Sequence, residues 1–436
     1  RGKQKRGRVA LIWVMIISLF VLMILGVPIA FAMGAAALFY IVVEGISLEI
    51  VTQRFFTSTQ SFAFLAIPFF ILMGSIMEHG GVAKRIINLA DSLVRSLPGG
   101  LASVSVVTNM GMAGVSGSAA ADAAAVGGVL MPEMKKKGYP ASFTAALNAS
   151  ASVVGVIIPP SSVIIIIAWL SNLSVGEMFL AGAVPGILIS LAYLILTIVI
   201  SVKRKYPREE KATWKEIGKN FLSASLTLIL PIFLVLSIVL GIATATEAAA
   251  LAAVYAFVIS VFIYRSLSFK QLFRALRDTV YTSTIVMFIV CSSMIFSWIL
   301  INEGVPKLIS DILLGFGLPY WALMLVIILI ITIGGMFLDT VPNLFIFVPI
   351  LYPITAEMGV DPMHFSIIML CTLSIGLFTP PIGTSLFVSC RIAKVRMENT
   401  IRDLTPYFLV GTAMVIVIAF IPSLSLWLPS LFGFSQ

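Results

Sequence analysis

The sequence has little charge, little cysteine and little histidine, and each shortage excludes a class of protein. Only 11% of its 436 residues are charged and 60% are hydrophobic, whereas a soluble globular domain carries about 25% charged residues. The mean hydropathy of +1.10 therefore indicates a polytopic membrane protein. The 3 cysteines lie in apolar segments without a CxxC spacing and the 2 histidines are far apart. A disulfide framework and a zinc site are excluded.

The sequence also gives no support for an ATP-driven transporter, a nucleic-acid-binding protein or an enzyme. The signature GxxxxGK[ST] is absent, so energy for transport must come from a source other than ATP. The net charge of +9 would suggest a nucleic-acid partner in a soluble protein. Here the basic residues gather in loops as the positive-inside rule requires, and no nucleic acid is expected. We find no convergent nucleophile, base or metal ligands, so an enzyme is not expected.

Long uncharged runs recur through the chain. A crossing needs roughly 20 apolar residues, which gives about ten crossings and several shorter apolar pieces. The runs are Val9–Val43, Phe143–Gly176, Met178–Val202, Asn220–Thr246, Ala248–Tyr264, Thr279–Asn302, Ile312–Leu338, Thr340–Ala356 and Thr405–Gln436.

The chain contains an internal repeat. GVIIPPSS begins at Gly155 and GLFTPPIGTS at Gly376, an offset of 376 − 155 = 221 that also aligns Gly114 with Gly335. Such self-similarity indicates two homologous halves. We predict a first repeat over 1–202, a cytoplasmic linker over 203–219 and a second repeat over 220–436.

The charges of the loops predict the orientation. The linker, the run Lys135–Lys137, the segment Arg265–Arg277 and the run Arg391–Arg396 are basic and are placed in the cytoplasm. Counting crossings between them makes the two repeats inverted, as in many secondary transporters. This count puts the N-terminus outside, although RGKQKRGR favours inside. Inside would be right if Val9–Val43 were one long tilted crossing.

Each half carries an apolar piece that is too interrupted to be a simple crossing. We predict a re-entrant hairpin at about 101–134 and at about 318–357, because irregular backbone at membrane depth is tolerated only inside protein or beside a cavity. A helix broken by Pro-Pro follows each hairpin. The broken helices are predicted at 143–170 and 362–390, and the remaining helices at 9–77, 178–202, 220–264, 279–301 and 405–432.

A helix broken at mid-membrane exposes carbonyl groups at one end and N–H groups at the other. The carbonyls suit a hard cation such as Na⁺, and the N–H ends suit an anionic substrate. Two alternatives remain open. Small residues can serve only for close helix packing, and Pro-Pro can mark a turn outside the membrane. The duplication at one offset favours the functional interpretation.

Three acids lie inside apolar segments, where a carboxylate costs roughly 2.5–3.5 kcal/mol on insertion scales and is a functional candidate. Asp339 lies at the tip of the second hairpin and is the best placed. Asp122 could be an N-cap of a hairpin helix. Glu247 begins a helix, which favours a capping or dipole role. The basic residues Lys84 and Arg95 belong to NLADSLVRSL and its flank, which we interpret as an interfacial amphipathic helix with its charges in water.

Together, GVSGSAAADAAAVG, GVIIPPS and GLFTPPIGTSLF resemble one family over essentially the whole chain. The chain resembles the large membrane subunit of tripartite ATP-independent periplasmic (TRAP) transporters, within the ion-transporter superfamily. The resemblance implies an all-α elevator-type transporter of the bacterial inner membrane that is driven by sodium and imports an organic acid. It also implies a periplasmic binding protein and a small four-helix subunit, in some members fused ahead of the large one. Such a fusion would account for a basic lead-in without Met.

The resemblance also implies at least two Na⁺ sites and a substrate site between the hairpin tips. The first Na⁺ site is expected at Gly114, Ser116, Ser118, Ser152 and Gly155. The second is expected at Gly335, Asp339, Thr340, Gly376 and Thr379. Substrate is expected near Ser118, Asn343 and Thr384.

The cargo itself is not specified by these residues. Sialic acid and C4-dicarboxylates both fit the resemblance, and a fused arrangement favours sialic acid. A stand-alone sodium–dicarboxylate symporter that needs no binding protein is the alternative, and an ion channel is a third hypothesis. Membrane lipid is the remaining expected partner.

Overall fold

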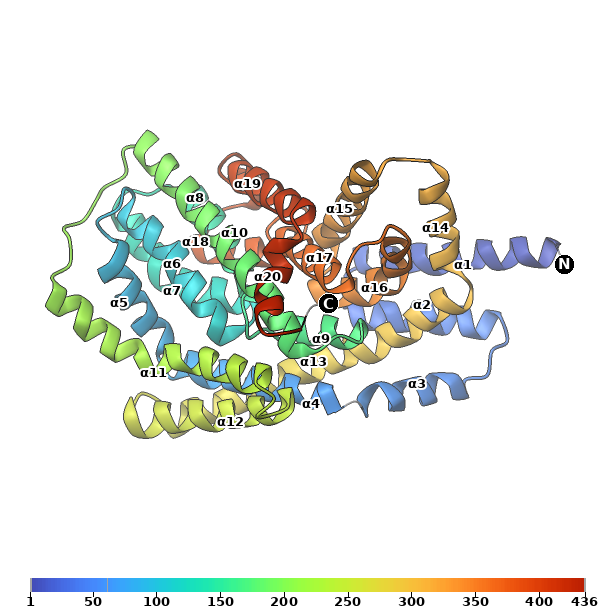
Figure 1. Cartoon of the computed structure of the whole chain (residues 1–436), viewed down its shortest axis with the longest axis horizontal. Helices are drawn as coiled ribbons and strands as arrows, with labels where there is room; N and C mark the ends of the chain where they lie inside the picture. Colours follow the sequence, from blue (N-terminus) through green and yellow to red (C-terminus); the bar gives the residue numbers. More distant parts are fainter. Residues whose placement is uncertain (1, 61, 435–436) are drawn as a thin grey trace.

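The computed structural model describes residues 2–60 and 62–434, and this part of the chain is helical throughout, without a strand (Figure 1). Among the described residues, 7 helices are long and apolar enough to cross a membrane. A pair bent by 67°, Phe64–His79 with Val82–Val94, would make an eighth crossing. The all-α polytopic fold class is confirmed.

The expected count of about ten crossings stays a prediction, because the described residues also contain shorter apolar helices that this count of 7 or 8 leaves out. The run Val9–Val43 is divided into α1 (Gly2–Ile24) and α2 (Ile29–Val43). The two helices pack against each other, and Pro28 precedes the first residue of α2, where proline is tolerated. One long tilted crossing over this run is therefore wrong.

The first half contains a helical hairpin with a sharp turn. Helix α6 (Gly100–Ser116) is followed by α7 (Ala119–Lys136), and Gly117 between them adopts φ 61°, a conformation that glycine takes without steric cost. The matching hairpin of the second half is α15 (Tyr320–Phe337) and α16 (Thr340–Glu357). Helices α7 and α16 are offset at both ends by 340 − 119 = 357 − 136 = 221 residues.

A broken helix follows each hairpin. The first is α8 (Ala141–Ser152), a 3-10 turn Val153–Val156, and α9 (Ser162–Leu170) after the two prolines. The second is α17 (Pro362–Gly376) and α18 (Thr384–Ala393). Both Pro-Pro bonds are cis. Pro159 and Pro160 are buried, so the first break is not a turn on the outside of the molecule.

The two halves interlock at these breaks. Helix α9 packs on α16 of the other half, and α18 packs on α7 and α8. The Ser385 hydroxyl lies 3.3 Å from the Ala119 carbonyl oxygen and 2.8 Å from the Ser152 hydroxyl. Each half-helix after a break is therefore held by the hairpin of the opposite half.

A row of long helices lies along one side of the hairpins (Figure 1). We call it the long-helix row, and it runs α11–α12–α4–α13, with each helix in contact with the next. The bounds are α4 (Phe62–His79), α11 (Trp214–Val239), α12 (Ala245–Val258, continued by a π turn Ile259–Ile263) and α13 (Phe269–Asn302). The other helices are α3 (Glu49–Thr59), α5 (Val82–Val94), α10 (Val175–Lys203), α14 (Val305–Gly315), α19 (Ile401–Phe420), after a 3-10 turn Met397–Thr400, and α20 (Ser423–Leu431).

The starts of α12 and α13 can be compared with the sequence predictions for Glu247 and for the basic loop Arg265–Arg277. Thr244 and Glu247 form a capping box at the start of α12, which confirms the capping role of Glu247. Ser268 and Gln271 form a second capping box, so α13 begins at Phe269 and most of the expected basic loop Arg265–Arg277 is helical. Hydropathy predicted a helix only over its apolar part, 279–301. The capping residues Ser268 and Gln271 lie upstream of that part and set the true start of the helix.

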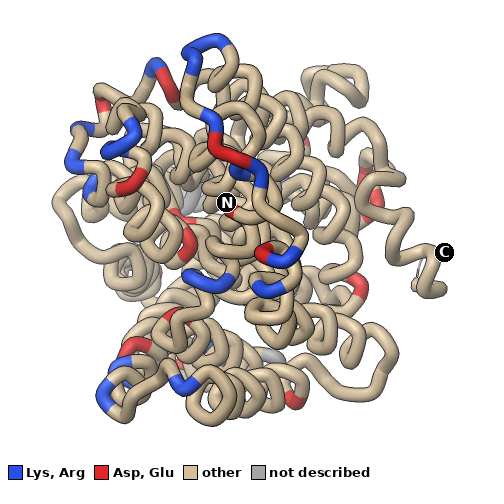
Figure 2. Tube along the Cα trace, turned by 90° about the vertical axis from the view of Figure 1, so that its left-hand side faces the viewer, with Lys and Arg blue, Asp and Glu red and all other residues tan. Residues whose placement is uncertain are grey.

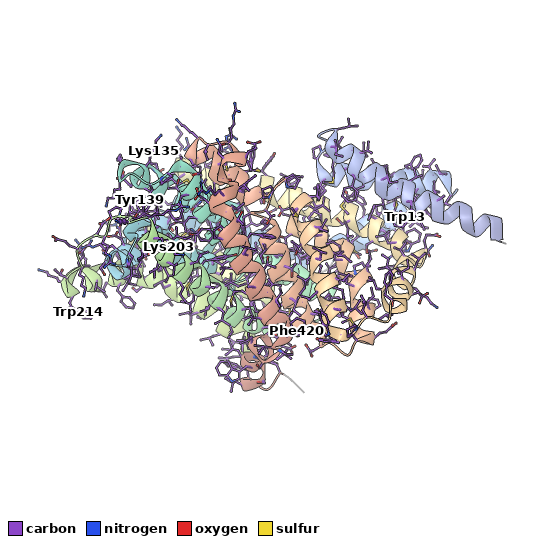
Figure 3. All side chains as sticks on the ribbon, turned by 90° about the horizontal axis from the view of Figure 1, so that it is seen from above. Trp13, Lys135, Tyr139, Lys203, Trp214 and Phe420 are labelled. Carbon is purple, nitrogen blue, oxygen red and sulfur yellow. The ribbon has the colours of Figure 1, made fainter. Side chains whose placement is uncertain are left out.

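Basic residues gather at one end of the molecule. Figure 2 looks at that end and shows many of the Lys and Arg residues on it. Figure 3 places Lys135, Lys203 and Trp214 toward this end and Trp13 toward the other. The end of the molecule that carries Lys135 and Lys203, called the basic end below, is the side that the positive-inside rule assigns to the cytoplasm.

We expect Gly376→Ala to destabilise the fold, because an added Cβ would overlap the backbone of Gly335. Overpacking of this kind costs about 1–3 kcal/mol, which thermal unfolding in detergent should report as a lower Tm. Gly218→Ala is the matched control, since nothing lies within 4 Å of its Cβ position and Ala is the better helix former. An equal Tm for both variants would contradict the tight packing at Gly376.

Candidate functional site

A cavity of about 500 Å³ lies between the two hairpin tips and the long-helix row. Ser116 to Ala121 of the first tip and Asp339 to Pro342 of the second form one wall. Helices α4 and α13 form the opposite wall, which includes Glu78, His79 and Asp278. The cavity is therefore the place where the two repeats and the long helices meet.

The first hairpin tip contacts the first helix break directly. A Cβ at Gly117 would lie 3.2 Å from the Pro160 carbonyl oxygen, and one at Gly114 would lie 3.5 Å from that of Pro159. Helix α4 reaches the same tip at Gly74, whose Cβ position is 3.4 Å from the Ser116 carbonyl oxygen. Glycine is needed here because backbone carbonyl groups approach where any side chain would stand.

Asp122 lies behind this contact and is fully buried, with 0% of its surface exposed. Neither of its carboxylate oxygens makes a hydrogen bond of ordinary geometry with another described residue, although the Ser116 hydroxyl lies near enough to interact with the carboxylate. A Cβ at Gly155 would overlap the carboxylate, so the glycine leaves the space that Asp122 fills. An isolated buried carboxylate is strongly unfavourable, and the site therefore requires a cation or a proton.

The N-cap interpretation of Asp122 is wrong. Ser118 occupies the N-cap position of α7, and its hydroxyl accepts a hydrogen bond from the Ala121 N–H at 3.4 Å. Asp122 is four residues later, where its own N–H already bonds the Ser118 carbonyl oxygen. Its carboxylate is therefore free of any capping task.

The three serines expected at the first site differ in their surroundings. Ser116 and Ser118 line the cavity, and the Ser116 hydroxyl oxygen accepts a hydrogen bond from the Ser118 N–H at 3.2 Å. Ser152 is buried and its hydroxyl bonds both the Ala149 carbonyl oxygen and Ser385. The structure thus brings Gly114, Ser116, Ser118 and Gly155 around Asp122 and the break, while Ser152 joins the two halves.

The residues expected at the second site also meet. A Cβ at Gly335 would lie 3.2 Å from the Gly376 Cα, so the tip and the break touch through backbone. The Ile382 N–H donates to the Met336 carbonyl oxygen at 3.3 Å. The Thr379 hydroxyl is occupied by the Ile375 carbonyl oxygen at 2.7 Å.

Two polar groups at the second tip are less fully engaged. The Asp339 carboxylate caps α16 by accepting from the Thr340 N–H at 2.7 Å, and it also lines the cavity. The Thr340 hydroxyl is buried without a hydrogen-bond partner among the described residues. Both oxygens are available to a further ligand.

Of the three residues expected to contact substrate, two line the cavity and one does not. Ser118 and Thr384 line the cavity. Asn343 lies beneath the second tip, where its Nδ2 is within 3.3 Å of the carbonyl oxygens of Gly334, Leu338 and Asp339. Its amide therefore holds the tip together and is not part of the cavity lining.

The opposite wall carries three titratable residues that the sequence interpretation did not select. His79 Nε2 lies 3.6 Å from an Asp278 carboxylate oxygen, and His79 Nδ1 lies 3.0 Å from the Ser75 carbonyl oxygen. Glu78 stands beside them. In residues 2–60 and 62–434 no three His, Cys, Asp or Glu side chains gather as a metal site, so a cation in this region would take most of its ligands from backbone and hydroxyl oxygens, with at most two such side chains.

The solved structures share this fold at low sequence identity. The transporter YdaH of Alcanivorax borkumensis superposes with a TM-score of 0.61 at 14% identity and covers 89% of both chains. At this identity the likeness concerns the fold alone.

Sequence comparisons are more specific. The chain is 38% identical to the 2,3-diketo-L-gulonate TRAP transporter large permease YiaN of Escherichia coli, covering 92% of this chain and 94% of the relative. It is 34% identical to the C4-dicarboxylate TRAP transporter large permease DctM of Rhodobacter capsulatus, covering 95% and 98%.

Residues 16–424 also match the model of the family described as tripartite ATP-independent periplasmic transporter, DctM component. A permease of this family is a multi-pass protein of the inner membrane and not an enzyme. It works with a periplasmic binding protein and a small membrane subunit. The chain belongs to the DctM family of large permease subunits of TRAP transporters.

Proposed function

We propose that this permease imports an organic acid anion in symport with Na⁺, by an elevator movement of the hairpins and broken helices along the long-helix row. The observation that carries the proposal is the buried Asp122 carboxylate, which makes no hydrogen bond of ordinary geometry in the described chain and is enclosed by the first tip and Gly155. Burying such a charge is tolerated when a cation compensates it.

The first sodium site combines this carboxylate with the oxygens of the first tip and break. The candidate ligands are Gly114, Ser116, Asp122, Gly155 and the carbonyl groups of the two prolines, while Ser118 shapes the tip as the N-cap. Hard cations prefer such oxygen ligands. The sequence predicts the same two glycines and Ser116 here, together with Ser118 and Ser152, and does not include Asp122 among the ligands.

The second sodium site lies at the other tip and break. Its candidate ligands are Asp339, Thr340 and the carbonyl groups around Gly335 and Gly376. Thr379 is less suited, since its hydroxyl already bonds the Ile375 carbonyl oxygen. The two sites together give at least two co-transported ions.

The cavity composition supports coupling between cation and anion. Its described lining contains Glu78, Asp278 and Asp339 but no Lys or Arg. An anion entering this space meets like charge unless cations enter with it. The hydroxyls of Ser118 and Thr384, at the N-terminal ends of α7 and α18, are placed to meet a carboxylate, since helix N-termini favour anions.

The cargo class follows from the relatives. 2,3-Diketo-L-gulonate and C4-dicarboxylates are the substrates in the names of two relatives, and both are carboxylates. We propose a small carboxylate of this kind, with sialic acid as the larger candidate. A periplasmic binding protein delivers it, and a small subunit packs beside the permease or precedes it in a fused chain. A stand-alone sodium–dicarboxylate symporter is the alternative function.

We expect Asp122→Asn to remove most of the thermal stabilisation that sodium gives. A ligand that binds only the folded state raises the Tm as its concentration rises, and the Asn variant keeps the side-chain shape without the charge that attracts Na⁺. The measurement is the Tm of purified protein in NaCl and in KCl at equal ionic strength.

Glu247→Gln is the control for this variant, because Glu247 is an exposed capping carboxylate outside the cavity. It should keep the full difference between NaCl and KCl. An Asp122→Asn protein whose Tm still rises in NaCl as much as the parent's would contradict the first sodium site.

Uptake into liposomes tests the transport proposal as a whole. With the small subunit reconstituted and the binding protein outside, an inward Na⁺ gradient should drive accumulation of a carboxylate. Ser116→Ala and Asp339→Ala should weaken this uptake, each by removing an oxygen beside a cation site. Uptake that is equally fast without the binding protein would favour the stand-alone symporter, and uptake that ignores the Na⁺ gradient would refute sodium coupling.

A further inference from the structure

The segment that connects the two halves of the chain is bonded to several neighbouring helices, unlike a linker that is surrounded by solvent. Residues 204–213 join α10 to α11 and contain no helix. This segment, together with Glu216 in the first turn of α11, is called the strap below. Its side chains and backbone contact α5 on one flank and α7, α8 and α19 on the other.

Arg95 at the end of α5 is the centre of the first flank. Its guanidinium donates to both carboxylate oxygens of Glu216, at 2.8 and 2.9 Å. Nε donates to the Glu210 carbonyl oxygen at 2.9 Å, and Nη1 also reaches Asp91 at 3.2 Å. In return, the Glu209 N–H donates to the Arg95 carbonyl oxygen at 3.3 Å. A paired fork of this kind is more directional than a single surface ion pair.

The expectation that Arg95 lies in water as part of an interfacial helix is therefore wrong. Only 19% of its side chain is exposed. Arg85 on the same helix donates to the Ser223 hydroxyl at 2.7 Å and lies 3.7 Å from the centre of the Tyr264 ring. These contacts join α5 to α11 and to the end of α12, which belong to the long-helix row, while α5 itself also packs on α6 of the first hairpin.

The second flank joins the strap to the block of hairpin and broken helices. Lys137, just after α7, pairs with Glu209. The Tyr206 ring packs against Tyr139 and Phe143, with ring centres 4.5 and 5.1 Å apart. Arg204 pairs with Asp403 of α19 at 2.5 Å.

The strap thus runs from α10, which packs on α6 and α19, to α11 of the row. The Arg95–Glu216 pair joins α5, which packs on the first hairpin, to the start of α11. Glu209 and Glu210 are adjacent residues, yet the Glu209 side chain bonds the α7 corner while the Glu210 carbonyl bonds Arg95. A sliding of one flank past the other must break at least one of these contacts. The cavity reaches Asp278 near the start of α13 and Glu78 and His79 in the last turn of α4.

We propose that the strap is a conformational tether that stabilises the arrangement seen here, and that in this arrangement the cavity is reached from the basic end. Release of Arg95 from Glu216 and Glu210 is then a step that accompanies movement of the hairpin block. The inference rests on the proposed elevator function, because it concerns the movement that such transport requires. It assigns to α5 and the strap a role in setting the balance between two states.

Labelling of a cavity residue tests the tether without sodium or substrate. A Thr282→Cys probe on the cavity wall is labelled with a membrane-impermeant maleimide in inside-out vesicles, where the cytoplasmic face is outward. The three native cysteines are buried and give the background in the parent. Arg95→Gln, Glu216→Gln and the double variant are compared with Lys136→Gln, which breaks the exposed Lys136–Glu133 pair outside the strap.

We expect Arg95→Gln and Glu216→Gln each to slow labelling about fivefold. Without the tether, a smaller fraction of the molecules is in the arrangement in which the cavity is reached from the basic end, and a modest shift between the two arrangements has an effect of this size. The double variant should be no slower than the slower single variant, since both remove one interaction. Lys136→Gln should label like the parent. The tether proposal would be overturned if Arg95→Gln, Glu216→Gln and the double variant were all labelled as fast as the parent. It would also be overturned if the effects of the two single variants multiplied in the double variant.

Folding is checked by size-exclusion elution of each variant. If Arg95→Gln is not folded, Glu216→Gln and Lys137→Gln carry the test, because Lys137 is exposed at the other flank and contributes little to the core. The labelling needs no ion gradient, so a failed sodium proposal leaves its result unchanged. Conversely, an Asp122→Asn protein that labels like the parent but has lost uptake would locate the fault in the ion site and not in the strap.

Discussion

The structure depends on how charge and backbone polar groups are satisfied in the interior of a membrane protein. A carboxylate buried at Asp122 and two interrupted helices would each be unfavourable in hydrocarbon. They are accommodated because each break is packed against a hairpin tip, through Gly117 in one half and through Gly335 and Gly376 in the other. The glycines allow backbone carbonyl groups to converge, and this convergence creates the candidate ion sites.

The interlocking of the halves follows from the same constraint. A broken helix cannot bond its own freed groups, so another element must cover it. Helix α18 is covered by α7 and α8, and α9 by α16. Ser385 and Ser152 join the two breaks by a hydrogen bond across the halves. Rearranging one tip therefore involves the other half, which suits the proposed coupling of ions to cargo.

Much of this arrangement could be predicted from the sequence, because the duplication repeats the same motifs at a constant offset. A single copy of a motif would not distinguish a functional break from an ordinary turn. The offset of 221 between the Pro-Pro breaks also separates the starts of α7 and α16. Glu247 was expected to cap a helix or to interact with its dipole because it lies at a helix start, and the structure pairs it with Thr244 in a capping box. Hydropathy left open whether Val9–Val43 is one crossing or two, because it measures apolar length and does not show that Pro28 divides this run into two packed helices.

Side-chain roles were predicted less well than positions. Asp122 was interpreted as a cap although Ser118, four residues earlier, is the better N-cap residue, and that spacing was a usable signal. Asn343 was expected in the cavity, and its bonding to three carbonyl groups beneath the tip depends on tertiary contacts. The same holds for Arg95, whose partner Glu216 is 121 residues away in the chain. Amphipathic spacing alone describes it as a solvated charge.

The central claim is that Asp122 lies at one of at least two sodium sites. Equilibrium dialysis of the purified permease against ²²Na⁺ measures this directly, by counting ions bound at saturation in the parent and in Asp122→Asn. The account predicts at least two bound ions in the parent and one fewer in the variant. The same number of ions in both proteins would contradict it.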